Sequence, residues 1–217
     1  MIKINKRPLP AGVEIKHESH YRSGIVFDLL FEDCFGKCYI CEDNTATSLN
    51  VEHRIPHRGD DQLKYDWNNL FLSCGHCNKI KWENFGEMIN PCITDPESVL
   101  ELRLETDDLI ERVVITQLVD DHSVSITVEL LEKVYNGEST AIKRVEAANL
   151  RNKISKDLLR FQKCIMDYKE EPDLGYADII ADEISNSSAF TAFKRQIVRD
   201  TPELSELLKD SGGFVLV

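Results

Sequence analysis

Apolar residues recur at helical spacing in several separate segments of the chain. In residues 24–35 this spacing predicts a short helix that Gly36 ends. The same spacing recurs in the C-terminal half, where glycine and proline separate the segments. The helices predicted there cover residues 125–135, 140–168, 178–199 and 202–209. We therefore expect a mainly helical C-terminal region.

Two shorter apolar runs, residues 99–104 and 111–116, predict a pair of short strands ahead of these helices. Residues 1–20 show little periodicity and contain two prolines, so we expect an extended arm outside the core. The character of the chain changes near Pro96, which suggests a first domain over residues 1–95 and a second over 96–217. The expected fold class is α+β.

Bulk composition predicts a soluble, folded protein. It has 217 residues, of which 42% are hydrophobic and 29% charged. No stretch approaches the roughly 18 to 20 apolar residues needed to span a bilayer, so we expect a cytoplasmic protein without a membrane partner. The seven cysteines are an odd number. In the reducing cytosol, clustered cysteines are more often metal ligands than disulfides.

The net charge of −12 argues against nucleic-acid binding, because phosphate recognition usually leaves a basic surface. Residues 51–85, however, contain five basic and five acidic residues and are neutral. The acidity therefore lies outside this segment. Such a distribution predicts weak affinity for DNA alone and a partner that supplies positive surface or presents the substrate.

The strongest chemical signal is a pair of Cys-x-x-Cys turns, Cys38 with Cys41 and Cys74 with Cys77. Four thiolates from two tight turns can surround one tetrahedral Zn²⁺ ion. The 32 residues between the two turns exceed the zinc-ribbon spacing of about 15 to 20, which leaves room for an inserted hairpin. Ordinary buried cysteines and redox thiols are the alternatives. Cys34 or His76 could also replace one ligand.

Between the two turns lies Val51-Glu52-His53-Arg54-Ile55-Pro56, followed by Trp67-Asn68-Asn69-Leu70 and then Cys77-Asn78-Lys79. These segments, in this order, resemble the HNH endonucleases in their His-Asn-Asn form. The resemblance covers about residues 35–85. It implies a ββα-metal fold, with two strands that carry the acidic residue and His53, and a helix beginning near Cys77 that carries Asn78. The chain has glutamate where aspartate is frequent and asparagine where histidine is frequent.

Phosphodiester hydrolysis needs an activated water, charge neutralisation at phosphorus and a stabilised leaving oxygen. His53, with a near-neutral pKa, is a candidate general base. The resemblance implies that Glu52 and Asn78 hold a single catalytic metal, and that Asn69 braces the loop that carries His53. Oxygen ligands suit Mg²⁺, and Mn²⁺ is equally compatible.

Basic side chains around this motif are candidate ligands for substrate phosphate. Lys79 and Lys81 flank the catalytic helix and are favoured over His57 and Arg58, because charges in loops are more often simply solvated. Arg54, directly after the candidate base, completes the set.

The first residues of the chain and the Glu52-His53 and Trp67-Asn68-Asn69-Leu70 segments more closely resemble the HNH subunits of Septu-type and retron-associated anti-phage systems. That resemblance implies a DNA endonuclease, acting on phage or plasmid DNA, that works with an ATPase partner, and it makes the helical C-terminal region the natural docking surface. Two alternatives stay open: an RNA or tRNA nuclease with the same site, and a zinc module that assembles or binds without catalysis.

Overall fold

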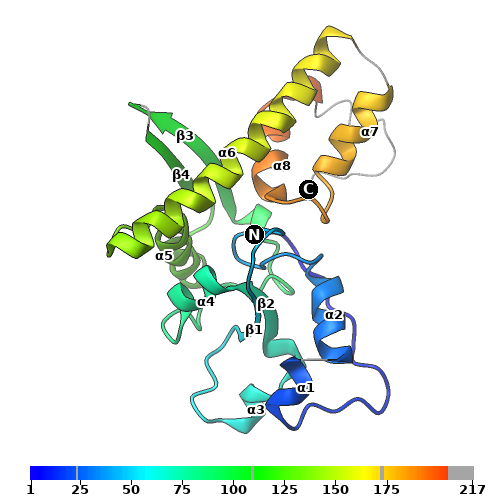
Figure 1. Ribbon diagram of the computed structural model, residues 1–217, viewed down its shortest axis with the longest axis vertical. Coiled ribbons are helices and arrows are strands. Elements are labelled where there is room, and N and C mark those ends of the chain that lie inside the picture. The colour runs from blue at the N-terminus through cyan, green and yellow to red at the C-terminus, as the bar shows by residue number, and fades with distance from the viewer. Residues whose placement is uncertain (23, 109, 172–173, 205–217) are drawn as a thin grey trace.

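The computed structural model describes residues 1–22, 24–108, 110–171 and 174–204, and Figure 1 shows how their elements are arranged. Within the described ranges, four short α-helices and two hairpins precede the helices of the C-terminal half. The helices are α1 (Glu18–Arg22), α2 (Ile25–Asp33), α3 (Asp61–Lys64), α4 (Gly75–Lys81), α5 (His122–Asn136), α6 (Ala141–Glu170), α7 (Leu174–Glu183) and α8 (Thr191–Arg199). The strands are β1 (Leu49–His53), β2 (Leu70–Cys74), β3 (Leu100–Asp107) and β4 (Ile110–Gln117). Helices and small antiparallel sheets together give the expected α+β fold.

Strands β1 and β2 form an antiparallel hairpin that leads directly into α4. In its register, Leu49 lies opposite Cys74 and His53 lies opposite Leu70. Both Glu52 and His53 therefore lie on β1, one after the other. Helix α4 begins at Gly75, two residues before the expected start, and its N-cap residue Cys74 accepts a hydrogen bond at Sγ from the backbone N–H of Cys77.

Hairpin β3–β4 confirms the predicted strand pair, with β3 continuing to Asp107 and β4 one residue longer at each end. Its apolar side chains alternate, and Leu100, Leu102 and Val113 are buried. Helix α5 packs against β4, α8 packs against β3, and the 30-residue α6 packs against α5 and α7. Figure 1 shows α6 as one continuous helix that runs from α5 to the α7–α8 region. The helical region beyond the hairpin is as expected.

The predicted helix over residues 178–199 is wrong, because two helices, α7 and α8, occupy this segment. The break follows a polar run of serines and asparagine at residues 185–188. Such side chains compete for backbone hydrogen bonds and favour turns. Phe190 then adopts a left-handed conformation, φ 50°, at the start of α8. Of the helix expected over residues 202–209, only residues 202–204 lie within the described part of the chain.

The N-terminal arm is part of the core, contrary to the sequence-based expectation. Met1, Ile2 and Ile4 are buried in a cluster that also includes residues of α5, α6 and α8. The backbone N–H of Ile4 donates to the carbonyl of Pro91 at 3.0 Å. Burial of these apolar side chains is favourable wherever they contact the core, even though their spacing in the sequence is not periodic. Because this cluster joins both sides of Pro96, the domain division there stays a prediction.

The longest described helix, α6, is rich in charged side chains. Within the described ranges, the chain contains no helix of the length and apolar character that crossing a membrane requires.

Candidate functional site

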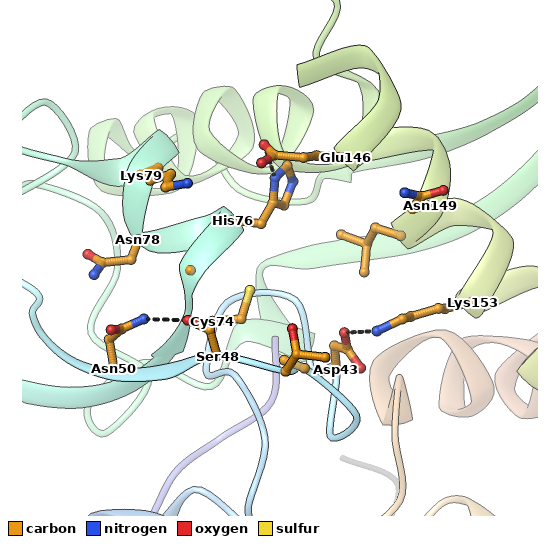
Figure 2. A pocket seen from close by; sticks show the side chains of 14 residues that line it. Asp43, Ser48, Asn50, Cys74, His76, Asn78, Lys79, Glu146, Asn149 and Lys153 are labelled. Carbon is orange, nitrogen blue, oxygen red and sulfur yellow. Dashed lines mark hydrogen bonds and ion pairs between the residues drawn. The ribbon is translucent and has the colours of Figure 1, made fainter. Parts of the chain in front are cut away.

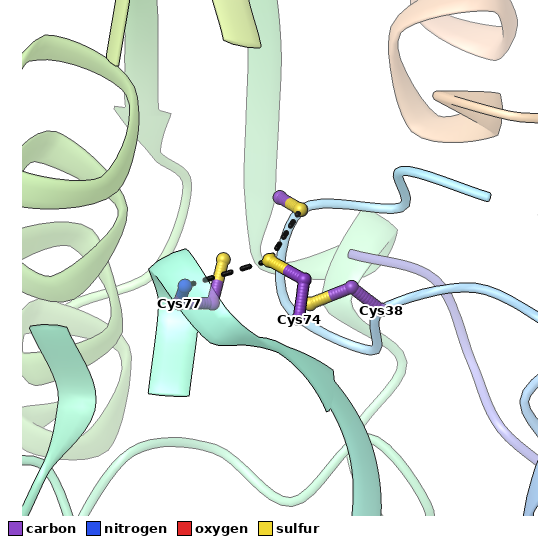
Figure 3. A group of neighbouring side chains, drawn as sticks. Cys38, Cys74 and Cys77 are labelled. Atoms are coloured by element: carbon purple, nitrogen blue, oxygen red, sulfur yellow. Dashed lines mark hydrogen bonds between the residues drawn. The ribbon is translucent and has the colours of Figure 1, made fainter. Parts of the chain in front are cut away.

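Four buried cysteines meet at the junction of β2, α4 and the turn that follows α2 (Figure 3). The Sγ atoms of Cys38, Cys41, Cys74 and Cys77 all lie within 4.8 Å of one another. Burial raises the pKa of the Cys77 thiol well above its ordinary value, so a cation is needed to favour its thiolate. Four converging sulfur atoms fit the tetrahedral preference of Zn²⁺. The cluster therefore supports zinc binding.

The two alternative ligands lie outside this group. Cys34 is a buried thiol whose pKa burial raises to about 12. His76 uses both ring nitrogens elsewhere: Nδ1 contacts the Glu146 carboxylate at 3.0 Å, and Nε2 donates to the Val134 carbonyl at 2.8 Å. His76 therefore ties the second cysteine turn to α5 and α6 instead of binding a metal.

His53 ends β1 with its imidazole half-buried. Its Nε2 lies 2.9 Å from the Lys64 carbonyl oxygen. Because a carbonyl only accepts hydrogen bonds, Nε2 carries the proton and Nδ1 keeps its lone pair. The rings of His57 and Tyr21 pack edge-on against it, with centroids 4.8 and 5.5 Å away. Burial lowers the pKa of His53, which favours the neutral form that a general base needs.

Glu52 points to the opposite side of the strand from His53, as adjacent strand residues do. It is only 5% exposed. Its carboxylate accepts hydrogen bonds from the Tyr39 hydroxyl and, at 3.2 Å, from Lys81 Nζ. The same ammonium donates to the His53 carbonyl at 2.8 Å. Burial raises the pKa of Glu52 and lowers that of Lys81, because each charged form loses water.

Asn69 joins the two segments that flank His53. Its side-chain oxygen accepts from the Ile55 backbone N–H at 2.7 Å. Its amide nitrogen donates to the carbonyls of Ile55 at 2.8 Å and Leu63 at 2.9 Å. Leu63 precedes Lys64, whose carbonyl holds His53. A single buried amide thus fixes both the chain that leaves β1 and the carbonyl that orients the imidazole.

Asn78 and Lys79, on α4, line a cavity of about 580 Å³ between the cysteine turns and α6 (Figure 2). Asn50 of β1 lines the same cavity, and Asn149 and Lys153 line it from α6. In Figure 2, His76 of α4 points to Glu146 of α6, whereas Asn78 lies on the other side of α4, near Asn50. Among the described residues, no hydrogen bond or ion pair joins Asn78 to Glu52, and Glu52 does not line the cavity beside Asn78.

Two of the five candidate phosphate ligands hydrogen-bond to groups of the protein itself. Lys81 is 1% exposed and ion-paired with Glu52. Arg54 donates through one terminal nitrogen to the carbonyls of Gly86 at 3.3 Å and Met88 at 3.0 Å. The Lys81 ammonium compensates buried acceptors and is not free to meet a phosphate, whereas half-buried Arg54 uses one terminal nitrogen in this way.

The other three candidates remain accessible. Arg58 is exposed, and its partner in the described part of the chain is the exposed Glu83. Lys79 is also exposed and lines the cavity beside Asn78. The Nδ1 atom of His57 accepts from the Gly59 backbone N–H at 3.1 Å, which leaves the other ring nitrogen available. These side chains lie on α4 and on the loop that follows His53.

Sequence analysis missed Tyr39, which lies inside the first cysteine turn and holds the Glu52 carboxylate. Its ring stacks on Phe71 of β2, with centroids 4.8 Å apart. Nothing in the local sequence distinguishes this tyrosine from a packing residue. It is identified only when the turn folds over the hairpin.

Residues 38–83 match the family model described as HNH endonuclease. The match includes both cysteine turns, β1, β2 and α4, so this segment is an HNH endonuclease domain, of a class that uses divalent metals. The chain is also similar to the Septu protein PtuB of Bacillus mycoides (strain KBAB4), with 27% identity over an alignment that covers 71% of this chain and 62% of that protein. The chain thus spans less than two thirds of the length of the curated relative that it matches.

Proposed function

We propose that this chain is a metal-dependent endonuclease that hydrolyses phosphodiester bonds of DNA. The observation that carries the proposal is the setting of His53 within the HNH domain. Its proton is fixed on Nε2 by the Lys64 carbonyl, and burial lowers its pKa. A half-buried histidine with a free basic nitrogen at Nδ1 is equipped to accept a proton from water.

His53 would remove a proton from the attacking water, and Asn69 is the positioning residue behind it. By holding Leu63 and Ile55, Asn69 keeps the Lys64 carbonyl and the end of β1 in a fixed relation. The half-buried His57 and the exposed Arg58 lie on the loop that follows His53, where they would contact substrate phosphate. Lys79 would do the same from α4.

Mg²⁺ or Mn²⁺ is the proposed catalytic cation, with Glu52 and Asn78 as its oxygen ligands. When bound, such a cation would neutralise charge at the phosphate. The donor types fit a hard cation, but Glu52 is already held by Lys81 and Tyr39. As arranged, these residues form no open cation site. Metal binding at Glu52 requires that the Lys81 ammonium leave the carboxylate.

Zinc in the four-cysteine cluster would act as a scaffold, since all four possible ligand positions are filled by protein sulfur. One ligand, Cys74, ends β2 and caps α4. A bound zinc ion would therefore fix the angle between the hairpin and the helix that carries Asn78.

We further propose that the nuclease is the effector of an anti-phage defence system and acts with an ATPase subunit in the cytoplasm. Similarity to the Septu protein PtuB supports this role. The net charge of −12 supports a need for a partner, because an acidic protein binds DNA weakly by itself.

The proposal is tested by plasmid cleavage with Mg²⁺ or Mn²⁺, with and without an ATPase encoded beside the gene. We expect His53→Ala to reduce cleavage by about 10²- to 10⁴-fold, the usual contribution of general base catalysis. Its zinc content and thermal unfolding should match the wild type. His122→Ala is the matched control, because His122 is an exposed histidine whose partner is the equally exposed Glu87.

Equal cleavage by wild type and His53→Ala would exclude His53 as the base. If the wild type cleaves a single-stranded or transfer RNA but no DNA, the substrate assignment is wrong and the site is that of a ribonuclease. If no substrate is cleaved under any condition, the domain serves assembly or binding.

A further inference from the structure

Helix α6 differs from the rest of this acidic chain in its charge. It carries eight of the 26 basic residues but only four of the 38 acidic ones. The helix is therefore positive, whereas the remainder of the chain is strongly negative. A local positive surface on an acidic protein marks a place where a polyanion can bind without general attraction to the whole molecule.

Basic side chains on α6 are aligned along one face. Lys153, Lys156 and Arg160 follow Asn149 at steps of four, three and four residues, which places them on neighbouring turns of one side. Lys153, Lys156 and Arg160 are all exposed, and Arg160 is 76% exposed. The opposite side of the helix supplies buried residues such as Ile154 and Leu158. The basic face is thus the solvent face of an amphipathic helix.

This face borders two hollows that share one residue. The cavity beside Asn78 is lined on the α6 side by Asn149 and Lys153 (Figure 2). A second cavity of about 570 Å³ continues from Lys153 to Lys156 and Arg160. The two hollows therefore form a path that begins at the proposed metal ligand and follows the basic side of α6.

The acidic side chains along this path already have cationic partners. Asp43 pairs with Lys153 at 2.6 Å. Asp157 is nearly buried and pairs with Lys194 at 2.6 Å and with Arg160.

Lys79 and Lys156, by contrast, have no acidic partner among the residues that the structure describes. One lies near each end of the path. These two ammonium groups form no ion pair there, and the exposed Arg160 guanidinium shares the Asp157 carboxylate with Lys194.

We propose that the path from Asn78 along Lys153, Lys156 and Arg160 binds the phosphate backbone of the substrate strand and leads it to the HNH site. This inference rests on the proposed nuclease function and adds the surface that positions the strand. The three cations extend over about 10 Å of helix axis, at 1.5 Å per residue. One strand of a duplex carries a phosphate about every 3.4 Å of helix axis, and the phosphates of an extended single strand lie farther apart, so the stripe spans about two of them. The amides of Asn50 and Asn149 supply hydrogen-bonding groups beside it.

Salt-dependent binding of a fluorescently labelled 20-nucleotide single-stranded DNA, measured by anisotropy without divalent cations, tests this path. We compare the wild type with Lys156→Gln/Arg160→Gln. The control is Arg112→Gln/Lys133→Gln, which removes the same charge from exposed positions on β4 and α5. The slope of log K against log salt is negative, and each lost phosphate contact reduces its magnitude by about 0.7 for a single strand. We therefore expect the magnitude to decrease by about 1.4 for the α6 variant. The control should keep the wild-type slope.

Equal slopes for the two variants, or no measurable binding by the wild type at low salt, would overturn the inference. A third outcome also overturns it: the α6 variant loses capture of a co-expressed ATPase while its DNA slope stays normal, which makes this face a protein-docking surface. The binding experiment and the cleavage experiment can give negative results independently of each other. A wild type that shows the charge-dependent slope but cleaves nothing supports the path and refutes the proposed function.

Discussion

The four-cysteine cluster and the α5–α6 helix pair belong to one buried core, but different forces stabilise them. Around the cysteines, sulfur atoms and buried charges meet, among them Glu42 and Lys37. Between α5 and α6 the contacts are apolar and include Leu131, Val134 and Ile154. The first region depends on ligands and partners that compensate buried charge, whereas the second depends on removal of apolar surface from water. The two regions should therefore respond to different perturbations.

The largest effect is expected from removal of one zinc ligand. Cys74→Ser should abolish zinc binding and cost on the order of 10 kcal/mol, comparable to the binding energy of structural zinc, so the HNH domain should not fold. Zinc content and thermal unfolding by circular dichroism measure this, and a strong chelator should have the same effect on the wild type. Cys34→Ser is the control, since Cys34 is buried outside the cluster and its loss should leave zinc content unchanged.

The next largest loss of stability is expected from a substitution of Glu42. It tests the contribution of buried charge pairs without removing a cysteine of the cluster. Its buried carboxylate contacts the Met1 ammonium at 2.7 Å and Lys37 at 3.6 Å, and it accepts from the Ala192 backbone N–H at 3.2 Å. Glu42→Gln leaves two buried cations uncompensated and should cost about 3–5 kcal/mol. For a chain of this size, that corresponds to a decrease in Tm of roughly 6–20 °C.

The control for this prediction is Glu32→Gln, because Glu32 forms an exposed pair with Arg7. Such pairs contribute about 0–1 kcal/mol. If Glu42→Gln and Glu32→Gln unfold at the same temperature, buried charges do not stabilise the cysteine region.

In the helix pair, truncation of an apolar side chain should act independently of zinc. Leu131→Ala removes a fully buried side chain and should cost about 2–5 kcal/mol. Leu159→Ala, on the exposed face of α6, should change stability by no more than about 0.5 kcal/mol. Denaturant titrations of each variant, with and without chelator, measure the cost of the truncation and whether that cost depends on zinc. A cost for Leu131→Ala that disappears when zinc is removed would mean that the two regions are not stabilised separately.

The smallest change in stability, but a large change in activity, is expected for Asn69. Asn69→Ala leaves backbone groups of Ile55 and Leu63 without their partners, which should cost about 1–3 kcal/mol. Cleavage should decrease through kcat, because the Lys64 carbonyl no longer orients His53. The neighbouring exposed Asn68→Ala should leave both kcat and stability unchanged. Wild-type kcat in Asn69→Ala would remove its positioning role.

Short-range patterns predicted the HNH region well. The spacing of four cysteines placed the cluster, and the His53 segment between them placed β1. Helix α6 and the β3–β4 pair followed from periodicity over many residues. In each case the determining residues are neighbours in sequence or repeat at a fixed interval.

What sequence analysis missed depends on contacts between distant residues. Met1 pairs with Glu42, and Lys81 pairs with Glu52 across 29 positions of the chain. Charged residues are usually exposed, and no sequence pattern indicates that Lys81 is buried or that Arg54 donates to protein carbonyls. The division of residues 178–199 into two helices depends on a serine-rich turn whose Thr191 hydroxyl donates to backbone carbonyls, a local competition that apolar spacing does not reveal.

His76 has a mechanical consequence for the space between α4 and α6. Placed between two cysteine ligands, it is bonded through Nδ1 to Glu146 on α6 and through Nε2 to α5. One imidazole thus connects α4, on one side of the cavity beside Asn78, to α6 on the other side. The cysteine cluster lies next to this connection. These hydrogen bonds hold the width of the cavity. A bound strand would therefore have to fit the existing width, because the walls do not close around it.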